Sequence, residues 1–111
     1  MEEFIIKTID ELENFNKSNP LNVVYFSTPE CNVCKVLKPK VKELIGNDFP
    51  EVKFAYVDLN NAREIAGQLT IFTVPTIITF AEGSESIRES RNVNLSEFYD
   101  KLLRIYNFIY N

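Results

Sequence analysis

Apolar residues along this chain follow two different periods, and the change of period marks the predicted elements. Short runs rich in β-branched and aromatic residues predict inner strands of a sheet. They span residues 21–26, 52–57 and 76–81. A shorter strand is expected at residues 4–6. A further strand is expected at residues 85–90, and its polar alternation is typical of a sheet edge.

Helical periodicity fills the segments between these strands. Apolar residues recur there at spacings of three and four, and the predicted helices span residues 8–17, 28–45, 60–69 and 95–110. Thr8 followed by Glu11 has the spacing of a capping box. Thr28 and Pro29 would begin the second helix as its N-cap and first helical residue. Gly-Asn at residues 46–47 would end it.

Strands that alternate with helices, followed by a hairpin, predict an α/β fold. A central mixed β-sheet would carry helices on both faces. The 111 residues fit one domain spanning 1–111. The content of 45% hydrophobic and 25% charged residues is that of a globular protein. A domain of this size can bury a core without disulfides, so its two cysteines need not be structural.

Charge and composition exclude several classes of function. The net charge is −4 with no cluster of basic residues, which argues against nucleic acid as a partner. No apolar run is long enough to cross a membrane, and the acidic residues 1–4 do not resemble a signal peptide. We therefore expect a cytoplasmic location. The absence of histidine excludes Ser-His-Asp and Cys-His catalysis within the chain.

The motif that carries chemistry is Cys31-Asn32-Val33-Cys34, where a predicted inner strand passes into a helix. The free N–H groups and the dipole at a helix start favour a thiolate. Cys31, nearer the start, is the predicted exposed nucleophile. Cys34, one turn further on, is the predicted resolving thiol, and this spacing allows a disulfide.

Other interpretations of the pair remain open. Two cysteines could be half of a zinc site, could bridge an iron–sulfur cluster between two chains, or could be inert. Zinc requires about four ligands, and the chain offers two cysteines and no histidine. We therefore expect neither a metal nor a cofactor. A CxxC beside a βαβ pattern in a cytosolic protein favours redox chemistry.

The surroundings of this motif resemble the thioredoxin superfamily. Besides the cysteines, the resemblance rests on Pro39, on the strand that ends at Asp58, on Val-Pro-Thr at 74–76 and on Glu-Gly at 82–83. It covers nearly the whole chain. It implies a thioredoxin-like fold and a protein-disulfide reductase that exchanges its dithiol with disulfide-containing proteins.

The resemblance also implies roles for single residues. Cys31 would attack a substrate disulfide and Cys34 would resolve the mixed disulfide. Pro75 would be cis and would pack against the disulfide, while Val74 would offer its backbone to an extended substrate segment. A thiol or a flavoprotein reductase would donate electrons to this chain. The chain itself would be a monomer. The implied substrate-binding residues are Thr73, Val74, Pro75, Glu30, Asn32 and Val33.

The chain departs from the family pattern around the cysteines. Tyr25 occupies the place of a buried acid, and Phe54 is expected in place of its lysine neighbour. No obvious base for Cys34 remains, although Lys35 is near in sequence. The tryptophans before the first cysteine are replaced by Ser27 and Glu30. A glycine of the substrate groove is replaced by Arg-Asn at residues 91–92.

These departures leave three questions open. Glu30 beside Cys31 would oppose formation of the thiolate. Phe72 is either an exposed aromatic anchor or part of the core. The function is then a disulfide reductase, a more oxidising or isomerising relative, or a protein-binding adaptor with a vestigial redox site.

Overall fold

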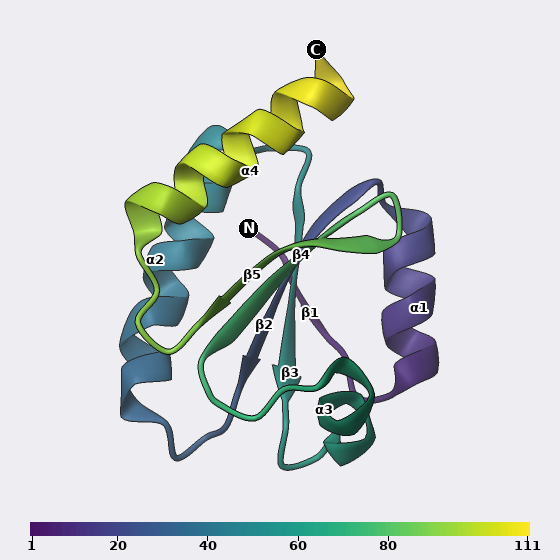
Figure 1. The fold of residues 1–111 in the computed structure, drawn as a ribbon, viewed down its shortest axis with the longest axis vertical. Helices are drawn as coiled ribbons and strands as arrows, with labels where there is room; N and C mark the ends of the chain where they lie inside the picture. The colour runs from purple at the N-terminus through teal and green to yellow at the C-terminus, as the bar shows by residue number, and fades with distance from the viewer.

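The computed structural model describes all residues 1–111, and Figure 1 shows a sheet between two pairs of helices. The strands are β1 (Glu3–Ile5), β2 (Leu21–Ser27), β3 (Lys53–Asp58), β4 (Thr76–Ala81) and β5 (Ser84–Ser90). The helices are α1 (Ile9–Ser18), α2 (Asn32–Asp48), α3 (Arg63–Leu69) and α4 (Leu95–Tyr110). None of these helices combines the length and the apolar character that a bilayer crossing requires. The elements follow the predicted order.

The sheet is mixed, as predicted, and its strand order is β1-β3-β2-β4-β5. Strands β1 and β2 run parallel to β3, while β4 is antiparallel to β2 and β5 is antiparallel to β4. Helices α2 and α4 cover one face, and α1 and α3 cover the other (Figure 1). The central strand β2 therefore has a packed helix layer on each side.

Alternation along β2 divides the core into two clusters. Leu21, Val23 and Tyr25 pack with residues of α2 and α4, and we call this side the α2/α4 face. Val24 and Phe26 pack with residues of α1 and α3, on the α1/α3 face. Successive side chains of a strand point to opposite faces. All five are fully buried, which explains the unbroken apolar run in the sequence.

The start of α1 confirms the predicted capping box. The Glu11 N–H donates to the Thr8 hydroxyl at 3.1 Å, and the Thr8 N–H donates to the Glu11 carboxylate at 3.1 Å. Each bond satisfies an N–H that has no partner within the helix.

The start of α2 differs from the prediction. The Cys31 N–H donates to the Thr28 carbonyl at 3.1 Å and closes a turn with Pro29 in its second position, where a fixed φ is favourable. The helix begins only at Asn32, and Cys31 is its N-cap. Thr28 and Pro29 are therefore turn residues, and the turn places the first cysteine at the helix start.

The end of α2 also differs. The helix continues through the predicted stop at residues 46–47 as far as Asp48, and the N–H of Phe49 donates to the Ile45 carbonyl at 2.8 Å. The Phe49 side chain is buried against the rings of Tyr99 and Tyr106. Packing against α4 therefore extends the helix beyond its local stop signal.

Candidate active site

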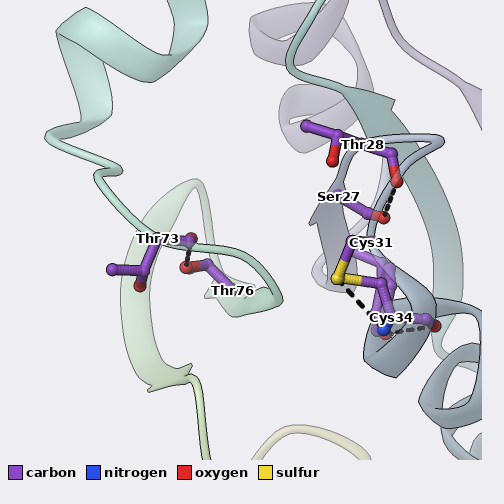
Figure 2. Close-up of a disulfide and its surroundings, with 7 residues drawn as sticks. Ser27, Thr28, Cys31, Cys34, Thr73 and Thr76 are labelled. Carbon is purple, nitrogen blue, oxygen red and sulfur yellow. Dashed lines mark hydrogen bonds between the residues drawn. A yellow bond between two sulfur atoms is a disulfide. The ribbon is translucent and has the colours of Figure 1, made fainter.

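Cys31 and Cys34 lie where β2 leads into α2, and they form a disulfide (Figure 2). Their Cα atoms are 5.3 Å apart. Cys31 is partly exposed, whereas Cys34 is 1% exposed and belongs to the core of the α2/α4 face. Cys31 is thus the more accessible sulfur, as its position in the sequence predicted.

The helix start supplies a hydrogen bond to the first sulfur. The Cys34 N–H donates to Cys31 Sγ at 3.2 Å. In the reduced protein the same N–H and the positive end of the helix dipole would stabilise a Cys31 thiolate. Cys31 therefore combines access with an environment that favours its nucleophilic form.

Tyr25 supports the second cysteine from within the core. Its hydroxyl donates to the Cys34 carbonyl oxygen at 2.8 Å. Burial, reinforced by the neighbouring Tyr56, raises the pKa of Tyr25 above that of a free phenol. The phenol thus remains protonated and donates a hydrogen bond where the family pattern has an acid.

Phe54 is a neighbour of Tyr25, as expected, although it is not its cross-strand partner. In the register of β2 and β3, Tyr25 pairs with Tyr56, and Phe54 pairs with Val23. The Phe54 ring still lies near Tyr25, with centroids 6.3 Å apart. Strand register was not fixed by the sequence pattern, because it depends on the neighbouring strand.

Glu30 forms a contact that the sequence analysis missed. The side-chain amide of Asn60 donates to the two Glu30 carboxylate oxygens at 2.9 and 3.2 Å. The Asn60 N–H donates to Asp58 at 2.9 Å. The loops that follow the parallel strands β2 and β3 share one edge of the sheet, and only this topology could have indicated the contact. Glu30 is thereby held toward the loop after β3.

Residues 73–76 lie next to the cysteine loop through the pairing of β2 with β4. Phe26 pairs with Thr76, so Pro75 lies beside the end of β2. Pro75 is buried, and the Val74–Pro75 peptide bond is cis. The Thr76 hydroxyl donates to the Thr73 carbonyl at 2.7 Å (Figure 2). Val74 is half-buried and packs on the same core cluster as Cys31.

Asn32 and Val33 form the exposed first turn of α2. They line a groove of about 750 Å³ whose other wall is the loop at residues 91–94. The predicted substrate-binding residues are therefore divided among the start of α2, the loop before β4 and the turn that precedes Cys31.

A second hollow, of about 370 Å³, is lined by Cys34 together with charged residues of α2 and β1. The Glu3 carboxylate accepts hydrogen bonds from Lys38 Nζ at 3.0 Å and Lys42 Nζ at 3.1 Å. Burial would raise the pKa of Glu3, but these two ammonium groups hold it below its ordinary value. Lys38 Nζ also lies 4.2 Å from the centroid of the Tyr56 ring.

Phe72 is 85% exposed. Of the two interpretations, core packing is therefore wrong, and the ring is available at the surface two residues before Val74. Its position in a loop, with no strand or helix to bury it, explains the exposure.

Comparison with known proteins agrees with this geometry. The family profile described as Thioredoxin matches residues 5–103. The thioredoxin-like protein YdfQ of Bacillus subtilis (strain 168) is 32% identical over 101 residues, which cover 91% of this chain and 89% of YdfQ.

Solved structures show the same fold. Fasciola hepatica thioredoxin superposes with a TM-score of 0.78 at 32% identity and covers 91% of this chain and 97% of its own. Oxidised mitochondrial thioredoxin 3 of Saccharomyces cerevisiae has a TM-score of 0.82 at 22% identity and covers 91% and 93% of the two chains. With its mixed sheet and its CxxC site at Cys31 and Cys34, the chain belongs to the thioredoxin family.

Proposed function

We propose that this chain is a single-domain, monomeric thiol–disulfide oxidoreductase that reduces disulfides of protein substrates in the cytoplasm. The observation that carries the proposal is the arrangement of the pair. A partly exposed Cys31 forms the N-cap of α2, and a buried Cys34 lies within bonding distance behind it. An accessible thiolate and a protected second thiol are what sequential thiol exchange requires.

The first step uses Cys31 as the nucleophile. Its thiolate attacks one sulfur of the substrate disulfide, a bond forms between that sulfur and Cys31 Sγ, and the substrate S–S bond breaks. The substrate sulfur that leaves carries the electron pair of the broken bond and is protonated. The product is a mixed disulfide in which Cys34 remains a thiol.

The second step uses Cys34. Its thiol loses a proton, attacks Cys31 Sγ and forms the intramolecular disulfide, while the bond to the substrate breaks and the second substrate thiol is released. Two electrons have then passed from the pair to the substrate. A thiol or a flavoprotein reductase would return them. The Tyr25 hydroxyl holds the Cys34 carbonyl and thereby keeps this cysteine in position for closure.

The substrate would lie along the segments that surround Cys31. The backbone of Thr73 and Val74 offers hydrogen bonds to an extended chain, and Pro75 has no N–H of its own. Glu30, Asn32 and Val33 would contact the residues on either side of the attacked sulfur.

The first test is the redox equilibrium of the pair in glutathione buffers, followed by the mass shift after alkylation. We expect a defined two-electron midpoint, and a value in the range of reducing oxidoreductases would support the cytoplasmic reductant. A midpoint in the oxidising range would replace the reductant with an oxidant or isomerase. Absence of a disulfide at every ratio of reduced to oxidised glutathione would overturn the redox proposal.

The second test separates an enzyme from an adaptor. The reduced chain is mixed with a disulfide-containing protein, and released thiols are counted. We expect Cys34→Ser to accumulate a mixed disulfide and Cys31→Ser, its matched control, to form none. A chain that binds its partner equally well with Cys31→Ser and releases no thiols in either form would be an adaptor.

A further inference from the structure

Building on the proposed function, we propose that the groove beside α2 selects substrates in which the segment next to the attacked cysteine carries an apolar residue and acidic side chains. We call it the α2 groove. It begins at the residues between the two cysteines, so whatever occupies it lies beside the sulfur that is attacked. Its lining residues include Asn32, Val33, Val36, Lys40, Arg91 and Val93.

The floor of the α2 groove is apolar and open to solvent. Val33 is 64% exposed and Val36 is 62% exposed, although both are apolar. The volume of about 750 Å³ is large enough for several side chains of a peptide. Burial of one apolar substrate side chain there would remove both valines from water.

The charges at the rim of the α2 groove have one sign. Lys40 of α2 and Arg91 of the loop before α4 are its only charged lining residues. Neither belongs to an ion pair within the chain. The protein as a whole carries 16 acidic and 12 basic residues, so this positive rim is opposite in sign to the net charge of the chain. Charge complementarity therefore favours acidic side chains in the bound segment.

The conformation of Arg91 places a charged side chain where the backbone favours glycine. Its φ is +62°, in the left-handed region, which residues other than glycine adopt infrequently. Its N–H donates to the Pro75 carbonyl at 3.0 Å, which ties the wall of the groove to the segment beside the cysteines. A charged side chain at such a position, against its backbone preference, is consistent with a role in binding.

The other side of the cysteine turn has the opposite charge. Glu30 immediately precedes Cys31, and its partner Asn60 is bonded to Asp58. The site is therefore electrically polar, negative before Cys31 and positive along the α2 groove. A substrate segment that places its acidic residues in the α2 groove keeps these residues away from Glu30. The opposite charges on the two sides of Cys31 therefore select the orientation of the bound segment as well as its charge.

The test uses peptides with one intramolecular disulfide that differ only in a pair of residues beside the attacked cysteine, either Asp-Asp, Asn-Asn or Lys-Lys. Their reduction by the dithiol form is measured as the second-order rate constant of a single turnover at low and high salt. We expect the Asp-Asp peptide to be preferred over the Lys-Lys peptide by about 3–10-fold at low salt, and by less at high salt, because exposed charges are screened.

Variants assign the preference to the α2 groove. Lys40→Gln combined with Arg91→Gln should abolish most of the preference, and Lys40→Gln alone, on an exposed helix face, should reduce it without affecting the fold. The matched control is Lys17→Gln combined with Arg63→Gln, which removes the same charges from the α1/α3 face and should leave the preference intact.

Each outcome decides the proposal. Equal reduction of the three peptides, a preference for the neutral or basic peptide, or a preference that survives the double variant would overturn it and leave the proposed function standing. If sedimentation shows a dimer and Lys40→Gln dissociates it, the groove binds a second copy of the chain. That result would also overturn the proposal. Failure to reduce any peptide, with no glutathione midpoint, would overturn the proposed function itself.

Discussion

The two faces of the sheet bury comparable cores but differ in what they support. Tyr25 and Phe26 are neighbours on β2 and both are fully buried, yet they point to opposite sides. Phe26 packs only among side chains of the α1/α3 face. Tyr25 packs on the α2/α4 face, whose core includes Cys34, and it bonds to the backbone of that cysteine.

The polar contacts of Asn22 on the α1/α3 face lie far from the cysteines. Asn22, at the start of β2, donates from its side-chain amide to Asn16 at 3.1 Å and to the Phe15 carbonyl. The cysteines follow the opposite end of the same strand. The comparison indicates that the Phe26 side chain contributes packing alone, whereas Tyr25 couples packing to the thiols.

The largest expected effect on the free energy of unfolding concerns Phe26, whose side chain contributes packing alone. Phe26→Ala removes a buried ring and should lower the free energy of unfolding by about 3–5 kcal/mol, as measured by urea unfolding. The midpoint of the Cys31–Cys34 equilibrium in the folded protein should not change, because Phe26 has no contact with the α2/α4 face.

If Phe26→Ala does not fold, Phe26→Leu provides the same comparison with a smaller loss of stability. A shifted midpoint in either variant would mean that both faces are coupled to the thiols, and the distinction between them would be lost.

A smaller effect on stability, with a larger effect on chemistry, is expected on the other face. Tyr25→Phe keeps the ring and removes the hydrogen bond to the Cys34 carbonyl, which should cost about 1 kcal/mol in the free energy of unfolding. Since Cys34 is then held less firmly, closure of the intramolecular disulfide should slow several-fold. The measurement is the lifetime of the mixed disulfide by mass spectrometry after rapid acid quenching. A lifetime equal to that of the unmodified chain would contradict the positioning role.

The smallest expected effect on stability lies at the edge of the α2/α4 face. There, Glu3 joins β1 to two lysines of α2. The pKa of Glu3 is lowered in the folded protein, because the bonds from Lys38 and Lys42 outweigh the effect of burial. A lowered pKa stabilises the fold above the ordinary glutamate value of about 4.3, and this contribution is lost as the pH falls through the folded pKa.

Glu3→Gln should therefore reduce stability at pH 7 by less than about 1 kcal/mol, since the pairs are partly exposed. Urea midpoints measured at pH 7 and at pH 3 provide the test. The two proteins should differ more at pH 7 than at pH 3. An equal difference at both values would show that the carboxylate charge contributes nothing.

The order of the elements was predictable because it depends on local periodicity. The capping box at Thr8 and the buried run of β2 are both encoded by neighbouring residues. The start of α2 was not predictable, because Thr28-Pro29 suits a turn as well as a helix start. The hydrogen bond from Cys31 to Thr28 determines the result only in three dimensions.

The candidate site divides in the same way. Cys31, Cys34 and Pro75 were found from a motif in the sequence. The contact from Asn60 to Glu30 and the pairing of Tyr25 with Tyr56 depend on which strands are neighbours, and no local pattern reports this. Arg91 was noted as a departure from the family, but its place in a groove required the packing of a loop against α2.

The disulfide joins residues only three positions apart. An unfolded chain loses little conformational freedom when so small a ring closes, compared with a link between distant segments. Opening the bond should therefore leave most of the stability in place, since the two buried cores hold the fold in either state. A cross-link of this size is poorly suited to reinforcing a protein, but it can be made and broken in every turnover without the chain having to refold.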